Sequence, residues 1–345
     1  MKAELTKSAD LRTTLAAAGY DPATEATLAR LLDVLQETKW SLSKVATDIG
    51  ISSTRLSRIL SGKYGADIGT SIGMVQEFLR RYGENQLVEP EHFVEIKAWQ
   101  LVRDAAQFAS MYHRVVNVYG PTQAGKTRAA LEYQARTRAA GSDHVLYLRM
   151  SACASCQSFA SDLCRALGME PRRRLYDMLT AIKARLSPRH LLIVDEIHEI
   201  ALGNGHVGLR IVEMLREILD LTHCGLVLIG TNVWRSVLTS THRTAVRKDW
   251  VGWLEQLDRR GDPVQIPATL SHEDTLAICA AYGLPEPDKD TLAVVRQILR
   301  DRGLGRLCKT LQAAATTARA AGKTFAWCHF LAVHGQLVQI SGGIR

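Results

Sequence analysis

Short apolar runs alternate with longer stretches of mixed polarity through the middle of this chain of 345 residues. Four runs have the length of buried strands, and they lie near 115–119, 145–150, 191–195 and 225–230. Helical stretches separate them, and this alternation is typical of a parallel sheet, because parallel neighbours need a long crossover connection. We therefore predict an α/β fold in the middle of the chain.

The first part of the chain has apolar residues at helical spacing only. Four leucines recur in this way between positions 28 and 35, and segment 42–60 predicts two short helices with Gly50 at the turn and the small Ala46 where they cross. This is the helix-turn-helix pattern. The apolar face of the pair carries Val45, Ile51, Leu56 and Ile59, and the outer face of the second helix carries Ser52, Ser53, Thr54, Arg55, Ser57 and Arg58.

The outer face suits phosphates and base edges, so Ser53, Arg55 and Arg58 are candidate DNA contacts. A helical bundle that binds a protein, or no partner, has the same pattern.

After Pro267 the sequence pattern predicts only helices, at 271–282, 288–302 and 305–321. The polar stretch 83–92 predicts a linker. Three domains are therefore expected: a helix-turn-helix domain at 1–86, a core at 87–264 and a helical lid at 265–345.

A phosphate-binding loop of the form G-x-x-x-x-G-K-[ST] follows the first apolar run. It reads Gly120-Pro121-Thr122-Gln123-Ala124-Gly125-Lys126-Thr127. The glycines let successive backbone N–H groups turn toward the phosphates at the positive end of the next helix. Lys126 then reaches the β and γ phosphates, and Thr127 offers its hydroxyl to Mg²⁺. We therefore predict ATP and Mg²⁺ as cofactors, with Arg128 also among the nucleotide contacts.

A second motif, typical of Walker B, supports an ATPase. The run Leu191-Leu192-Ile193-Val194 ends in Asp195-Glu196, which suits a buried parallel strand that delivers carboxylates at its carboxyl edge. Asp195 is expected to hold Mg²⁺ through water, and Glu196 to orient and deprotonate the attacking water. A core strand that ends in a surface Asp-Glu pair is the alternative.

A P-loop sheet followed by a helical lid is the layout of the AAA+ class, whose remaining parts have candidates here. Asn232, at the tip of the 225–230 strand, is a candidate sensor of the γ-phosphate, although Asn also favours turns. Arg259, or else Arg260, is the candidate arginine finger, since a fork-shaped cation stabilises charge on the transferring phosphoryl group. Arg306 in the lid resembles a second sensor. For these arginines, a surface position is the alternative.

Charge points to a polyanionic partner. The chain has a formal net charge of +8, which favours nucleic acid. Residues 170–190 contain six Lys and Arg against two acidic residues, and they include Arg172, Arg173 and Arg174. Residues 1–86 are nearly balanced, with 11 Lys and Arg against 10 Asp and Glu. We therefore predict DNA contacts at the three arginines, with a solvated charged face as the alternative.

Other signals bear on location. No apolar run approaches the ~20 residues of a membrane span, and the first residues lack a signal-peptide core. We therefore expect no membrane partner and a cytoplasmic location. Seven scattered cysteines favour reduced thiols there. Cys153 and Cys156 have the spacing of metal ligands, but no second pair accompanies them, so no zinc site is expected.

In this order of motifs the chain resembles the phage Mu transposition protein B family of AAA+ ATPases. The resemblance is carried by Lys63-Tyr64, Pro90-Glu91-His92-Phe93-Val94-Glu95, Ser151-Ala152-Cys153-Ala154-Ser155, Gly225-Leu226-Val227-Leu228-Ile229-Gly230, Arg243-Thr244 and Arg306. It implies an ATP-driven helical filament on double-stranded DNA, without strong sequence preference, that presents the DNA to a DDE transposase. The transposase in turn stimulates ATP hydrolysis.

Carried onto this chain, the resemblance implies nucleotide contacts at residues 120–127, Asp195, Glu196, Asn232 and Arg306. It also implies that the loop after the second strand and a basic helix near Arg172–Arg174 face DNA. The chain departs from the family pattern at two places. Thr231-Asn232 replaces a different pair of residues at the strand tip, and Asp258-Arg259-Arg260 contains two candidate fingers instead of one. An ATP-switched transcription regulator is the alternative function. A helicase-loading ATPase is a third hypothesis.

Overall fold

The computed structural model describes residues 19–38, 40–64, 68–85, 87–202, 205–238 and 261–340. Contacts divide the chain into two compact units. The N-terminal unit comprises Met1–Val88 with Thr316–Lys323, and the sheet unit comprises Glu89–Ala315 with Thr324–Arg345. None of the helices in the described ranges is long and apolar enough to cross a membrane.

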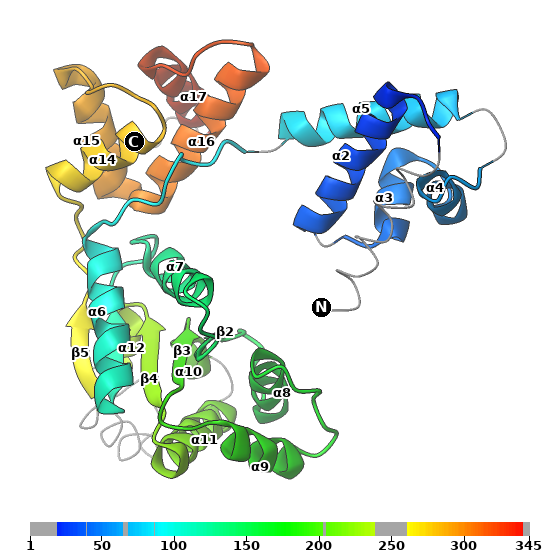
Figure 1. Ribbon diagram of the computed structural model, residues 1–345. Coiled ribbons are helices and arrows are strands. Elements are labelled where there is room, and N and C mark those ends of the chain that lie inside the picture. The colour runs from blue at the N-terminus through cyan, green and yellow to red at the C-terminus, as the bar shows by residue number, and fades with distance from the viewer. Residues whose placement is uncertain are drawn as a thin grey trace. The chain divides into compact units, whose positions relative to one another are not determined.

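The N-terminal unit is helical throughout its described part. Its helices are α2 (Pro22–Thr38), α3 (Leu42–Ile49), α4 (Ser53–Leu60) and α5 (Gly69–Asn85) (Figure 1). The chain turns between α3 and α4 at Gly50, whose φ of 88° favours glycine. The hydroxyls of Ser41 and Ser52 cap α3 and α4, and each accepts a hydrogen bond from a backbone N–H three residues later. The two short helices therefore lie within the predicted segment.

One side of these helices forms the core of the unit. Val45, Leu56 and Ile59 are fully buried, as the sequence pattern predicts. Ile51 also faces this core, as predicted, although it is only half-buried. Ile51 lies in the turn after Gly50, where its side chain packs against the edge of the cluster rather than within it.

The described residues of the sheet unit form a sheet of five parallel strands. These are β1 (Val115–Tyr119), β2 (Val145–Arg149), β3 (Leu191–Asp195), β4 (Gly225–Gly230) and β5 (Gly261–Gln265), in the order β2-β3-β4-β1-β5. The four predicted strands and their parallel arrangement are confirmed. The fifth strand was not predicted because it contains Pro263. A proline fits only where no N–H is needed in the ladder, and β5 lies at the sheet edge.

Helices cover both faces of this sheet (Figure 1). They are α6 (Lys97–Tyr112), α7 (Lys126–Ala139), α8 (Cys156–Ala166), α9 (Leu175–Arg185), α10 (Glu199–Leu202), α11 (Gly205–Thr222) and α12 (Asn232–Leu238). Val194 belongs to a buried cluster with Phe159 of α8 and Ile182 of α9. Its neighbour Ile193 belongs to a second cluster with Trp99 of α6 and Ala130 of α7. Consecutive strand residues point to opposite faces, so each cluster fills one face.

The described part of the chain after β5 is helical. Its elements are α14 (His272–Ala281), α15 (Lys289–Arg302), α16 (Leu304–Ala320) and α17 (Trp327–Ile340). The first three match predicted helices. The fourth was not predicted, because its 14 residues include no Asp, Glu, Lys or Arg to mark a solvent face. Phe330 of α17 is fully buried in the same cluster as Ile278 and Leu307.

Candidate nucleotide site

The loop at 120–127 joins the carboxyl end of β1 to the first turn of α7. Gln123, with a φ of 60°, and Gly125, with a φ of 91°, both have a left-handed backbone conformation. Helix α7 begins at Lys126, so the unpaired N–H groups of its first turn adjoin the loop. The positive end of the helix dipole is there as well, and the two together favour an anion such as phosphate.

The ammonium group of Lys126 is held inside this loop. Lys126 is only 8% exposed, and its Nζ donates hydrogen bonds to the carbonyl oxygens of Gly120, at 3.0 Å, and Pro121. Burial lowers the pKa of Lys126, and the nearby charges of Asp195 and Glu196 oppose that shift. A buried cation therefore lies between the loop and the carboxylates that end β3.

Asp195 is the residue that joins β3 to the loop. Its carboxylate is 1% exposed. Oδ2 accepts a hydrogen bond from the Thr127 hydroxyl at 2.7 Å, and Oδ1 accepts one from the Glu196 backbone N–H at 2.8 Å. A hydroxyl and a carboxylate are hard oxygen ligands of the kind that Mg²⁺ prefers. These two side chains therefore fit a magnesium ion beside a bound triphosphate.

A second hydroxyl, which sequence patterns did not predict, also reaches Asp195. Tyr147 of β2 donates a hydrogen bond to Asp195 Oδ2 at 2.9 Å. Burial, and then the negative charge of Asp195, raise the pKa of the Tyr147 phenol, so it stays a proton donor at neutral pH. Strand register explains the contact, since Tyr147 is paired with Ile193, two residues before Asp195 on the same face.

Glu196 lies between two basic side chains. Its backbone has a φ of 55°, which is uncommon for a residue with a side chain. One carboxylate oxygen, Oε1, is 3.8 Å from Nη2 of Arg149, and the other, Oε2, is 3.5 Å from Nδ1 of His198. The Glu196 side chain is 28% exposed. It therefore remains accessible to water at the carboxyl edge of the sheet.

A cavity of about 570 Å³ opens beside these groups. Residues 122–129 of the loop and helix form one wall, and Glu196 and Thr231 also line it. Apolar side chains form the rest, among them Phe93, Trp99, Ile278, Tyr282 and Leu304. An apolar chamber that adjoins a phosphate-binding loop has the chemistry needed for a nucleoside triphosphate.

The strand tip presents Thr231 rather than Asn232 to this cavity. Asn232 is exposed as the first residue of α12 and is not among the lining residues. Thr231 lines the cavity, and its Oγ1 is buried without a hydrogen-bond partner. A buried hydroxyl without a partner is costly, so Thr231, which lines the cavity, is a candidate ligand contact.

The arginines predicted as nucleotide contacts do not all lie at the cavity. Arg128 lines the cavity. Arg306 is half-buried and is not among the lining residues. It lies near His334, whose pKa is lowered by burial and then by the Arg306 charge. Arg259 and Arg260 lie outside the described residues.

The N-terminal end of α16 contacts the phosphate loop through its backbone rather than through Arg306. The N–H of Gly305 donates a hydrogen bond to the carbonyl oxygen of Gln123 at 3.1 Å. A Cβ at Gly305 would lie 3.0 Å from the Cβ of Gln123, so a larger residue here would require Gln123 to shift by a few tenths of an ångström. Movement of α16 would therefore be transmitted directly to the loop.

The basic candidates on the sheet unit lie in a loop and not on a helix, which corrects the prediction of a basic helix there. Arg172, Arg173 and Arg174 are exposed, and α9 begins only at Leu175. The Gln157 side chain of α8 donates a hydrogen bond to the carbonyl oxygen of Arg173 at 2.9 Å and so fixes the loop at that point.

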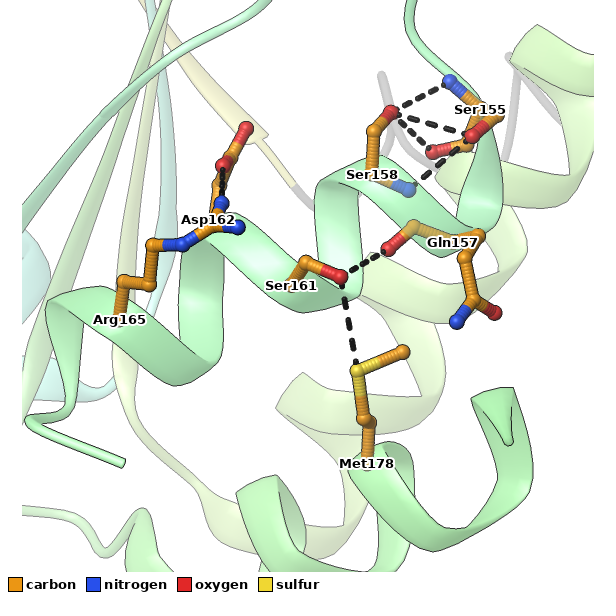
Figure 2. A network of polar contacts seen from close by, with 7 residues as sticks. All are labelled: Ser155, Gln157, Ser158, Ser161, Asp162, Arg165 and Met178. Atoms are coloured by element: carbon orange, nitrogen blue, oxygen red, sulfur yellow. Dashed lines mark hydrogen bonds and ion pairs between the residues drawn. The ribbon is translucent and has the colours of Figure 1, made fainter. Parts of the chain in front are cut away.

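Figure 2 shows how α8 itself is held after the loop that follows β2. The Ser155 side chain accepts a hydrogen bond from the Ser158 N–H, and the Ser158 side chain accepts one from the Ser155 N–H. Ser161 donates to Met178 of α9 at 3.6 Å, so α8 and α9 are joined. The helices before and after the arginine loop are therefore in direct contact.

The candidate contacts in the N-terminal unit are on α4. Ser53 and Arg58 are exposed, as expected. Arg55 is half-buried, with its guanidinium 5.3 Å from the centre of the Tyr64 ring. The packing of Arg55 on Tyr64 leaves Ser53 and Arg58 as the more accessible of the three.

Comparison with known proteins gives one family match and several relatives. The model of an AAA domain matches residues 109–238. The "ATP-dependent target DNA activator B" proteins of Escherichia phages Mu and D108 are each 28% identical over 300 residues, which is 86% of this chain and 89% of theirs. The "Mu-like prophage FluMu DNA transposition protein B" of Haemophilus influenzae is 25% identical over 289 residues, and the alignment covers 79% of this chain and 91% of that protein. The predicted AAA+ P-loop ATPase fold is thereby confirmed.

Proposed function

We propose that this chain, which belongs to the phage Mu transposition protein B family of AAA+ ATPases, assembles on double-stranded DNA when it binds ATP. The assembled protein delivers that DNA to a DDE transposase, which stimulates ATP hydrolysis. The observation that carries the proposal is the buried junction of Lys126, Thr127 and Asp195 beside a nucleotide-sized cavity. The names of the relatives, which refer to target DNA and transposition, supply the biological role.

Each residue of the site has a separate role in ATP binding or hydrolysis. Lys126 binds the β and γ phosphates, and Thr127 and Asp195 hold Mg²⁺, which neutralises charge on the transferring phosphoryl group. Glu196 orients the attacking water and takes its proton. The pairing of Glu196 with Arg149 and His198 keeps its carboxylate at the edge of the cavity.

Two further positions complete the proposal. Thr231 takes the sensor role that was predicted for Asn232, because Thr231 lines the cavity and its buried Oγ1 has no hydrogen-bond partner. Arg128 is the arginine that lines the cavity. Arg259, or else Arg260, would act as the arginine finger, and such a finger serves the nucleotide of a neighbouring subunit. This last role requires that the protein form oligomers.

DNA is held mainly through charge. The net charge of +8 and the exposed Arg172, Arg173 and Arg174 favour phosphate contacts that do not depend on the DNA sequence.

An ATP-switched transcription regulator is the second candidate function, because the exposed polar face of α4 is suited to base edges. A regulator binds half-sites at a fixed spacing, whereas a filament has no such footprint.

Electron microscopy with DNA of random sequence tests the assignment. We expect filaments or long oligomers on DNA with a non-hydrolysable ATP analogue, and bare DNA with ADP. Nuclease footprinting on the same DNA should show uniform protection with the analogue. A discrete footprint at one sequence, formed equally with ADP, would contradict the proposal and favour the regulator.

A further inference from the structure

We infer that Tyr147 is a positioning residue that determines how strongly Mg²⁺ increases the affinity of this site for ATP. The inference rests on the proposed function, in which Asp195 holds the ion. Tyr147 donates a hydrogen bond to Oδ2 of Asp195 at 2.9 Å from the neighbouring strand β2. Neither residue is among those that line the nucleotide cavity. Tyr147 therefore acts behind the carboxylate and not on the nucleotide.

The hydrogen bonds around Asp195 explain why the phenol matters. Oδ2 accepts from Thr127 and Tyr147, and Oδ1 accepts from the Glu196 N–H. Of these three donors, Thr127 belongs to the nucleotide loop and the Glu196 N–H belongs to the next residue of the chain. Tyr147 is the one donor of the three that comes from a separate strand. It fixes the plane of the carboxylate independently of the nucleotide.

A carboxylate fixed in this way is preorganised for a metal ion. Removal of an outer-shell hydrogen bond to a metal-binding carboxylate typically reduces metal affinity 10- to 100-fold. Asp195 is 1% exposed, so water cannot readily replace the lost phenol. Binding of ATP without metal depends on the loop and the apolar chamber, which Tyr147 does not contact through its hydroxyl. The effect should therefore appear only when Mg²⁺ is present.

The alternative is that Tyr147 serves only to pack the core. Its ring lies against the apolar cluster formed with α6 and α7. A packing role depends on the ring and is retained by Phe, whereas positioning depends on the hydroxyl. Tyr133 is a matched control, because it is a half-buried tyrosine on α7 in the same cluster, with its ring 6.4 Å from Trp99.

The test measures binding of a fluorescent ATP analogue to the full chain, in EDTA and in saturating Mg²⁺. For Tyr147→Phe we expect an EDTA affinity within about twofold of the parent and a Mg²⁺-induced gain about tenfold smaller. Tyr133→Phe should retain both affinities. If Tyr147→Phe keeps the full gain, or if it loses EDTA binding as well, the inference is wrong.

The parent chain separates this inference from the proposed function. If the parent binds the analogue and Mg²⁺ strengthens that binding, the proposed nucleotide site stands and the Phe variant decides the role of Tyr147. If the parent does not bind the analogue under either condition, the proposed function fails and the inference fails with it. Melting temperatures of both variants verify that each is folded.

Discussion

The nucleotide site and the outer face of α4 hold their polar side chains in opposite ways. At the nucleotide site, Lys126 and Asp195 are 8% and 1% exposed, and each has hydrogen-bond partners inside the protein. On α4, Ser53 and Arg58 are exposed to solvent. Buried charges are stable only in a fixed set of partners, so the nucleotide site is suited to one kind of ligand. The exposed face of α4 is not restricted in this way.

The difference also determines how each region should respond to substitution. Removing a buried charge leaves its partners uncompensated, and the effect spreads through the site. Removing an exposed charge deletes one screened interaction, whose contribution is small and additive. The nucleotide site should therefore show large, all-or-none effects, whereas the surface candidates should show graded ones.

The largest effect is expected at Lys126. Lys126→Ala removes the buried ammonium group, so the β and γ phosphates lose their main cation, and both nucleotide binding and DNA assembly should be abolished. Titration with a fluorescent ATP analogue and electron microscopy on DNA measure the two losses. Lys97→Ala, at the start of α6, is a control that should retain both activities. Normal assembly of Lys126→Ala on DNA would show that DNA binding is independent of the nucleotide site.

Glu196→Gln should act on hydrolysis alone. Gln has nearly the same shape but cannot take a proton, so we expect ATP hydrolysis to fall by about 10²–10⁴-fold while ATP binding persists. The variant should remain on DNA after ATP is added, as seen by sedimentation with DNA. Glu199→Gln, three residues later in α10, is the matched control and should hydrolyse ATP normally. Hydrolysis at the parental rate by Glu196→Gln would remove Glu196 as the base.

The sequence alone predicted the part of this site that is contiguous. The loop 120–127 and the pair Asp195-Glu196 are local motifs, and the strands that carry them are simple apolar runs. Tyr147 was not predicted, because its role depends on the order β2-β3, which sets Tyr147 beside Ile193. A tyrosine in an apolar run has no sequence feature that distinguishes it from a core residue.

Other differences also depend on where the fold places each residue. Asn232 was favoured as a sensor because it is a polar residue at the tip of its strand, but as the first residue of α12 it is exposed, and Thr231 lines the cavity instead. The strand that contains Pro263 was missed because edge position depends on the whole sheet. The family resemblance implied a basic helix near Arg172–Arg174, whereas the helix starts after the three arginines.

The exposed arginine loop of the sheet unit should give a graded effect on DNA binding. Replacing Arg172, Arg173 and Arg174 together with Ala should weaken binding equally for unrelated sequences, because phosphate contacts do not read bases. The slope of log affinity against log salt should flatten by roughly 0.9 per lost contact, or about 2.7 for three. Arg165→Ala, whose guanidinium is 2.7 Å from Asp162, is a control with a small expected effect. An unchanged slope in the triple variant would exclude this loop as a DNA contact.

The smallest effect is expected on α4. Ser53→Ala combined with Arg58→Ala removes one exposed charge and one hydroxyl, so the salt slope should change by about 0.9 at most. The N-terminal unit should remain folded, because both side chains are exposed and the α4 cap is supplied by Ser52. Affinity is measured on several unrelated duplexes at the same salt concentration. Contacts to base edges contribute about 1–3 kcal/mol of discrimination each, so their loss would appear as a large decrease on one sequence only. Such a sequence-selective loss, beside a triple-arginine variant that binds normally, would favour the operator-binding regulator over the transposition ATPase.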